Sequence, residues 1–186
     1  MQEGCVLCPR KCGVDRNIQR GACNAPYFPY VAKAALHMWE EPCISGKRGS
    51  GAIFFCGCNL KCVFCQNYDI SNGSVGKMYD AEGIAELMLR LQGKGAHNVN
   101  LVSPAPFVPV LADAIRAAKN RGLSIPVVYN TNSYETLEAL RMLDGLVDIY
   151  LPDLKYVSGA VSKKYSGTEN YFEYACLLYT SDAADE

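Results

Sequence analysis

The chain has 186 residues, of which 49% are hydrophobic and 20% are charged. This composition is sufficient for one globular core with a small appendage, and it excludes a disordered or collagen-like protein. No apolar run approaches the roughly 18 residues needed to cross a bilayer, and the N-terminus lacks the apolar core of a signal peptide. We therefore expect a cytoplasmic protein without membrane contact, and a formal net charge of -1 predicts no binding to nucleic acid.

The first predicted element is a cysteine-rich segment, "CVLCPRKCGVDRNIQRGAC", which contains few hydrophobic residues. Disulfides are rare in the cytosol, so clustered thiols there indicate metal ligands more than bridges. Four thiols with C-x2-C at their head suit a closed tetrahedral zinc site or a 4Fe-4S cluster, and free thiols on a loop are the alternative. We predict a metal-binding appendage over residues 1–34, in which zinc or a second cluster is held by Cys5, Cys8, Cys12 and Cys23.

Four basic residues lie among these thiols. They could lower the thiolate pKa values or contact a partner, but side chains of this kind more often face solvent. We expect the solvated arrangement for Arg10, Lys11, Arg16 and Arg20.

From residue 52 onward, strand and helix patterns alternate with short connections. Short apolar or alternating runs predict strands at 52–55, 98–103, 125–130 and 147–152. Apolar residues at helical spacing predict one helix capped by Asp80, a second over 108–118 closed by Gly122, and a third over 133–143 capped by Ser133. This alternation indicates the α/β class, with a parallel sheet whose chemistry lies at the carboxyl ends of its strands.

A loop of closely spaced cysteines, "CGCNLKCVFCQN", follows the first of these parallel strands. Three of its thiols, Cys58, Cys62 and Cys65, have the order C-x3-C-x2-C. Thiolates hold iron-sulfur clusters, and since four normally saturate a 4Fe-4S cube, three leave one iron open to a small molecule. A zinc site completed by Cys56 is the alternative. We expect Cys56 instead to end the strand as a buried small residue.

This loop, with Phe64 just before its last cysteine, resembles the signature of radical S-adenosylmethionine (SAM) enzymes. The resemblance extends over nearly all of the chain, at residues 35–71, 95–109, 125–136 and 147–156. Together these stretches are similar to an uncharacterised branch labelled pyruvate formate-lyase activating enzyme-like. The resemblance implies a 4Fe-4S cluster whose open iron binds S-adenosyl-L-methionine, and its cleavage to methionine and a 5'-deoxyadenosyl radical. It also implies an anaerobic oxidoreductase that needs a reducing electron donor of the flavodoxin or ferredoxin type.

The same resemblance assigns cofactor contacts to the strand ends. Where the activases carry Gly-Gly-Glu-Pro, this chain has "SPAP" without the glutamate, which leaves the Ser103 hydroxyl or backbone carbonyls to touch the amino group of SAM. "YNTN" stands where the activases carry Asp-Thr-Asn-Gly, and "LPDLK" matches their Asp-x-Lys, in which the lysine faces the methionine carboxylate and the aspartate helps to hold a monovalent cation. The alternatives are a plain turn for Ser103 and an exposed ion pair for the last two residues. The predicted cofactor-binding residues are Phe64, Ser103, Asn130, Thr131, Asp153 and Lys155.

The last eleven residues, "CLLYTSDAADE", resemble the translation of a sequencing adaptor. We expect residues 176–186 to be an artefact that does not pack on the core, with the natural chain cut near Ala175. The implied fold over 35–175 is a partial (β/α) TIM-type barrel of the radical SAM kind, truncated after about four strand-helix units, with the cysteine-rich appendage before it. The fourth strand is then an exposed edge, and we expect the fragment to bind a cluster poorly and to be inactive.

Three functions are consistent with these residues, none of which assigns a catalytic residue beyond the cluster ligands. The first is a radical SAM activase that abstracts a hydrogen atom from a partner similar to a glycyl-radical enzyme. The second is a radical SAM enzyme acting on a small molecule or an RNA base. The third is a non-catalytic metal-binding module.

Overall fold

Six strands form one mixed sheet in a computed structural model that describes residues 4–73 and 75–181. The strands are β1 (Tyr30–His37), β2 (Ser50–Phe55), β3 (Lys77–Met78), β4 (Val99–Val102), β5 (Val127–Thr131) and β6 (Ile149–Pro152). Their spatial order is β3-β1-β2-β4-β5-β6, in which β2, β4, β5 and β6 are parallel while β1 and β3 are antiparallel to their neighbours. The sheet is open, with β3 and β6 at its edges, and the mixed α/β architecture is consistent with the predicted partial barrel.

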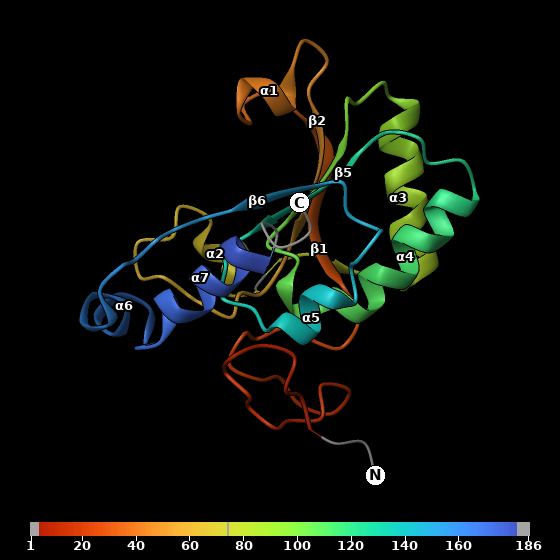
Figure 1. The fold of residues 1–186 in the computed structure, drawn as a ribbon. Helices are drawn as coiled ribbons and strands as arrows, with labels where there is room; N and C mark the ends of the chain where they lie inside the picture. Colours follow the sequence, from red (N-terminus) through yellow and green to blue (C-terminus); the bar gives the residue numbers. More distant parts are fainter. Residues whose placement is uncertain (1–3, 74, 182–186) are drawn as a thin grey trace.

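Two long helices cover one side of the sheet, α3 (Ala81–Gly93) and α4 (Val108–Asn120) (Figure 1). The prediction that Asp80 caps α3 is confirmed, because its Oδ1 atom accepts a hydrogen bond from the Gly83 amide at 2.8 Å. Residues at the predicted helical spacing, including Ile84, Met88 and Leu91, are fully buried. They pack with the matching face of α4 and with the sheet in the larger of two hydrophobic clusters. These helices hold the strands in register, and so fix the ends of the strands.

The other side of the sheet carries α2 (Tyr68–Ser71), α6 (Gly159–Ser166) and α7 (Tyr171–Ser181) (Figure 1). The remaining short helices are α1 (Pro42–Ser45), the 3-10 turn η1 (Ala105–Phe107) and α5 (Leu137–Arg141). A second hydrophobic cluster lies between α6, α7 and the cysteine loop, and its buried members are Leu60, Cys62, Tyr134, Tyr156, Tyr171 and Ala175. The cysteine loop is thus packed against the C-terminal helices. Across the described residues, no helix combines the length and the apolar character needed for a membrane span.

Strand β1 is absent from the sequence-based prediction, and the predicted domain boundary between residues 34 and 35 falls inside it. Its sequence, "YVAKAALH", is rich in alanine and lacks a clear alternation of apolar and polar residues. It is ordered by long-range pairing, with Ala34 opposite Ile53 of β2 and Val31 opposite Lys77 of β3. The cysteine-rich segment therefore continues directly into the core sheet.

The predicted start of the third helix is wrong. Ser133 has a φ of 63°, a left-handed conformation, whereas an N-cap residue is extended. Thr136 is the cap of α5, since its Oγ1 atom accepts a hydrogen bond from the Ala139 amide at 3.3 Å. The residues before Thr136 form a turn, in which Asn132 Oδ1 accepts from the Tyr134 amide at 3.0 Å.

The prediction that residues 176–186 do not pack on the core is also wrong for the part of them that the structure describes. Helix α7 runs through Cys176 to Ser181, and Leu178 is only 5% exposed within the larger hydrophobic cluster. The Tyr179 hydroxyl donates to the carbonyl of Pro152 at 2.7 Å. Residues 182–186 lie outside the described residues. The adaptor origin of the segment stays a prediction.

Candidate cluster and cofactor site

A cavity of about 490 Å³ opens where the parallel strands end. Every residue predicted to bind the cluster or SAM in the core lines it: Cys58, Cys62, Phe64, Cys65, Ser103, Asn130, Thr131, Asp153 and Lys155. They come from the loops after β2, β4 and β6 and from the end of β5. Parallel strands bring their carboxyl ends to one edge of a sheet, so residues far apart in the sequence meet there.

The loop after β2 directs its thiols into this cavity. Its backbone turns at Lys61, which has a φ of 51°, and the Cys65 amide donates to the Cys62 carbonyl at 3.1 Å. Asn132 Nδ2 donates to Cys58 Sγ at 3.3 Å, and Ser166 Oγ donates to Cys62 Sγ at 3.2 Å. Burial raises the pKa of the Cys58 thiol, which favours the protonated form in the metal-free protein. Hydrogen bonds to the sulfurs favour the thiolate that a metal requires.

The asparagines around this loop were not predicted as site residues. Asn59 is 1% exposed; its Nδ2 atom donates to the Tyr134 carbonyl, and its Oδ1 atom accepts from Asn132 Nδ2 at 2.9 Å. Asn132 thus joins Asn59, Cys58 and the turn after β5. The sequence signal was present in "YNTN", but only the fold shows that Asn132 turns towards a sulfur.

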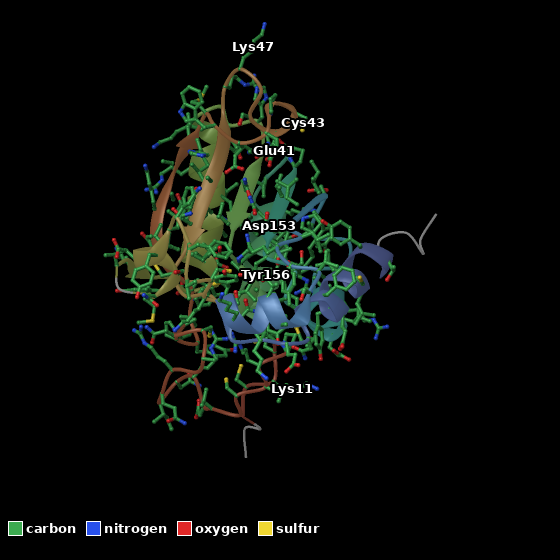
Figure 2. The ribbon with its side chains drawn as sticks, turned by 90° about the vertical axis from the view of Figure 1, so that its left-hand side faces the viewer. Lys11, Glu41, Cys43, Lys47, Asp153 and Tyr156 are labelled. Atoms are coloured by element: carbon green, nitrogen blue, oxygen red, sulfur yellow. The ribbon has the colours of Figure 1, made fainter. Side chains whose placement is uncertain are left out.

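Three of the predicted cofactor-binding residues lie just beyond the ends of β4 and β6. Ser103 has a φ of 58°, a conformation that costs a non-glycine residue energy and that clusters at functional sites. Asp153 and Lys155 follow β6, which ends at Pro152, so they do not stand on the strand. Their side chains form an ion pair at 2.7 Å, and both are partly exposed. Figure 2 shows Asp153 and Tyr156 in the middle of the molecule, and the Tyr171 hydroxyl of α7 donates to the Asp153 carbonyl at 2.7 Å.

A buried carboxyl lies behind the end of β5. Glu135 is 3% exposed, and burial raises its pKa to about 7. Its Oε2 atom accepts from the Tyr129 hydroxyl at 2.6 Å, and its Oε1 atom accepts from the Thr131 hydroxyl. Glu135 therefore orients the side chain of Thr131, a cavity residue, although no pattern in the sequence marks Glu135 as a site residue.

The cavity residues outside the predicted set include the titratable pair His37 and Glu40. His37 ends β1, and its ring contacts Phe54 edge to face with centroids 5.8 Å apart. Burial raises the pKa of Glu40, while His37, 3.9 Å away, opposes that shift. Their place on the cavity depends on the pairing of β1 with β2, which the sequence did not indicate.

Residues 52–176 match the family described as "Radical SAM superfamily". The chain belongs to the radical SAM superfamily. A curated relative from Methanocaldococcus jannaschii, "Uncharacterized protein MJ0674", is 35% identical over 178 residues, which cover 92% of this chain and 51% of the relative. The chain thus spans about half the length of the relative it matches. The match thus identifies a domain of the radical SAM kind over residues 52–176.

Radical SAM proteins use a 4Fe-4S cluster and SAM, and the residues of this chain fit both. The three loop thiols are free and share a cavity within the range of about 300–1,000 Å³ that is usual for ligand sites. Cys56, by contrast, is fully buried, and its thiol donates to the carbonyl of Val75. Cys56 is therefore not placed to serve as the fourth ligand that a zinc site in this loop would require.

The four upstream thiols of this radical SAM chain gather around a separate, small cavity of about 10 Å³. Its lining includes all of Cys5, Cys8, Cys12 and Cys23. The pKa of Cys8 is raised to about 11, chiefly by burial and to a smaller extent by the neighbouring thiols Cys23 and Cys5. Among residues 4–73 and 75–181, no three His, Cys, Asp or Glu side chains are already arranged around a single metal ion. Zinc or a second cluster at these thiols stays a prediction.

Two of the four upstream basic residues are not solvated as expected. Arg10 and Arg16 donate to backbone carbonyls, Arg10 in the cysteine loop and at the end of α6, and Arg16 at Ala25, Pro26 and Pro106. Lys11 and Arg20 are exposed, as predicted. Figure 2 shows Lys11 at the foot of the molecule and Cys43 near the opposite end, so Cys43 lies apart from the upstream thiol set.

Proposed function

We propose that this chain carries the core of a radical SAM oxidoreductase of the pyruvate formate-lyase activating enzyme-like branch. The observation that carries the proposal is the single cavity shared by three free thiols and the polar ends of three parallel strands. When bound, the 4Fe-4S cluster supplies the electron that cleaves SAM to methionine and a 5'-deoxyadenosyl radical, which abstracts a hydrogen atom from the substrate. The resemblance of the strand-end motifs to those of the activases supports the choice of branch.

In this proposal Cys58, Cys62 and Cys65 hold three irons of the cluster. Asn132 and Ser166 keep donating to the sulfurs of Cys58 and Cys62, which stabilises the thiolates and orients the loop. Phe64 contacts the rings of Tyr156 and Tyr165 edge to face, each with centroids 6.1 Å away, and lines the cavity.

The strand ends hold SAM. Ser103 and the backbone beside it contact the amino group, Lys155 faces the methionine carboxylate, and Asp153 helps to hold a monovalent cation. Asn130 and Thr131 complete this face. The ion pair between Asp153 and Lys155 is compatible with these roles, because both residues line the cavity and are reachable from it.

The proposed substrate is a glycine in a partner protein similar to a glycyl-radical enzyme, with electrons from a flavodoxin or ferredoxin in an anaerobic cytoplasm. A small molecule or an RNA base is the alternative substrate. A glycyl-radical enzyme encoded next to the natural gene would favour the first, and its absence would favour the second. We also propose that the four upstream thiols hold zinc or a second cluster.

Anaerobic reconstitution of the chain with iron and sulfide tests the function. We expect a brown protein with broad visible absorbance whose cluster binds SAM. Replacing Cys62 by alanine removes the absorbance that belongs to the loop. A colourless chain that retains zinc alone would establish the non-catalytic module instead.

A further inference from the structure

The upstream thiol segment and the three-cysteine loop are packed directly against each other. The Cys58 amide donates to the Cys23 carbonyl at 3.0 Å, so a predicted ligand of each thiol set takes part in one hydrogen bond. Gly57 makes this approach possible, because a Cβ atom there would stand 2.9 Å from both the Cys23 carbonyl oxygen and the Cβ atom of Ala25. Its φ of 92° also excludes most other residues. The two segments therefore meet through their backbones at this point.

Arg10 makes the second connection. It lies in the turn between Cys8 and Cys12, where the Lys11 amide donates to the Cys8 carbonyl at 3.0 Å. Its guanidinium donates to the carbonyls of Asn59 at 2.8 Å and Leu60 at 3.3 Å in the three-cysteine loop. It also donates to the carbonyls of Ser166 at 2.7 Å and Gly167 at 3.0 Å at the end of α6, and it lies 5.9 Å from the centre of the Tyr134 ring.

These four bonds use most of the five donors of one guanidinium. Two of these carbonyls belong to residues next to the predicted cluster ligands. Leu60 lies in the sequence between Cys58 and Cys62, and the Ser166 hydroxyl donates to Cys62 Sγ. A single side chain thus connects the upstream thiol turn with the backbone that carries the loop and with the helix end that contacts its sulfur. Lysine, with a compact ammonium, cannot reproduce this fork.

The upstream segment is ordered by loop contacts, such as those of Arg16 with the carbonyls of Ala25, Pro26 and Pro106, and not by secondary structure. Between residues 4 and 29 the structure describes no helix or strand, and most side chains there are exposed or half-buried. Cys8 and Cys12, on either side of Arg10, line the small cavity together with Cys5 and Cys23. Metal binding by these thiols would supply the free energy that fixes such a segment.

We propose that metal binding by the four upstream thiols fixes Arg10, and that Arg10 is the positioning residue for the backbone of the three-cysteine loop. The upstream centre is then a clamp on the radical cluster site. This inference rests on the proposed function, because Arg10 positions the loop for a cluster only if the loop binds one.

The first experiment removes the thiols of the three-cysteine loop, so that its outcome is independent of the proposed radical SAM activity. In the full chain carrying Cys58→Ala, Cys62→Ala and Cys65→Ala, the amide of residue 58 still donates to Cys23. Amide hydrogen exchange over 57–61 is measured after stripping the protein of metal, after adding zinc, and after adding iron with sulfide. We expect one metal to bind and to slow exchange about tenfold in this stretch, with α3 unchanged. Failure of both metals to bind, or binding without slower exchange, overturns the clamp.

The second experiment tests Arg10 with the loop thiols intact. Arg10→Ala is expected to keep the upstream metal, to lose about tenfold in iron bound at the three-cysteine loop, and to change the electron paramagnetic resonance (EPR) signal of the reduced cluster. Arg10→Lys should recover part of the iron, and Lys11→Ala, which removes an exposed neighbouring charge, should match the parent. Parent-like iron and an unchanged signal in a folded Arg10→Ala protein overturn the role of Arg10. A parent protein that binds no cluster at all overturns the proposed function instead.

Discussion

The two thiol sets of this protein differ in their number of ligands and in the space in front of them. The three-cysteine loop sits at the end of a four-stranded parallel array and opens into a cavity of about 490 Å³. The upstream set has four thiols around about 10 Å³ in a segment described without helix or strand. Metal centres with a full set of protein ligands are typically structural, whereas those with an open position do chemistry. Under the proposed function, the loop is then the reactive centre and the upstream set the stabilising one.

The largest effect that we expect comes from removing one thiol of the three-cysteine loop. Cys58→Ala should lower the cluster content, measured by visible absorbance and iron analysis, by more than about tenfold, because each ligand carries one iron. Cys56→Ala should leave the cluster largely intact, since this thiol already donates to Val75. The reverse ranking of the two variants would show that the ligand set is wrong.

The packing of α7 beside the loop gives the next prediction. Leu178 is 5% exposed, and Leu178→Ala should lower the free energy of unfolding by roughly 2 to 5 kcal/mol in a denaturant titration. The adjacent Leu177 is 42% exposed, so Leu177→Ala should change it by less than about 0.5 kcal/mol. The loss should be accompanied by weaker cluster binding, with upstream metal retained. Equal effects of the two variants would mean that α7 does not pack as described.

Glu135 makes the stability near the cavity depend on pH. Its pKa of about 7 in the folded protein exceeds the ordinary value of 4.5, so its stabilising contribution is complete below pH 4.5 and is lost as the pH rises through 7. The loss is about 3 kcal/mol at most. Glu135→Gln should remove this dependence, whereas Glu138→Gln, at an exposed position, should keep it. The free energy of unfolding is measured by denaturant titration between pH 4 and pH 8. If Glu135→Gln keeps the pH dependence of the parent protein, Glu135 is not its source.

The smallest predicted effect concerns the backbone at Ser103. Ser103→Gly should stabilise the fold by about 1 kcal/mol, because glycine adopts a φ of 58° without the strain that serine bears there. Ser103→Ala retains the strain and should not stabilise. If the hydroxyl contacts SAM, both variants bind SAM more weakly despite their different stabilities. Weaker SAM binding in only one of the two variants would show that the backbone conformation at residue 103, and not the hydroxyl, controls the binding.

Local signals account for the parts of the fold that the sequence predicted. Asp80 and the apolar spacing after it define α3, and the run before Cys56 defines β2. The missed features depend on distant partners. Strand β1 is ordered by β2 and β3, and the acceptors of Arg10 lie between 49 and 157 residues away in the sequence. Glu135 and Asn132 became visible as site residues only once the turn after β5 was placed beside the loop.

EPR spectroscopy of the reconstituted, reduced protein, with and without SAM, tests the central claim most directly. If three thiols hold a 4Fe-4S cluster with one open iron in the cavity, the reduced protein gives a cluster signal, and adding SAM shifts it. The signal and the shift disappear together in a Cys62→Ala protein, whatever metal the upstream thiols retain. A cluster signal that does not respond to SAM, or that persists without Cys62, would contradict the account.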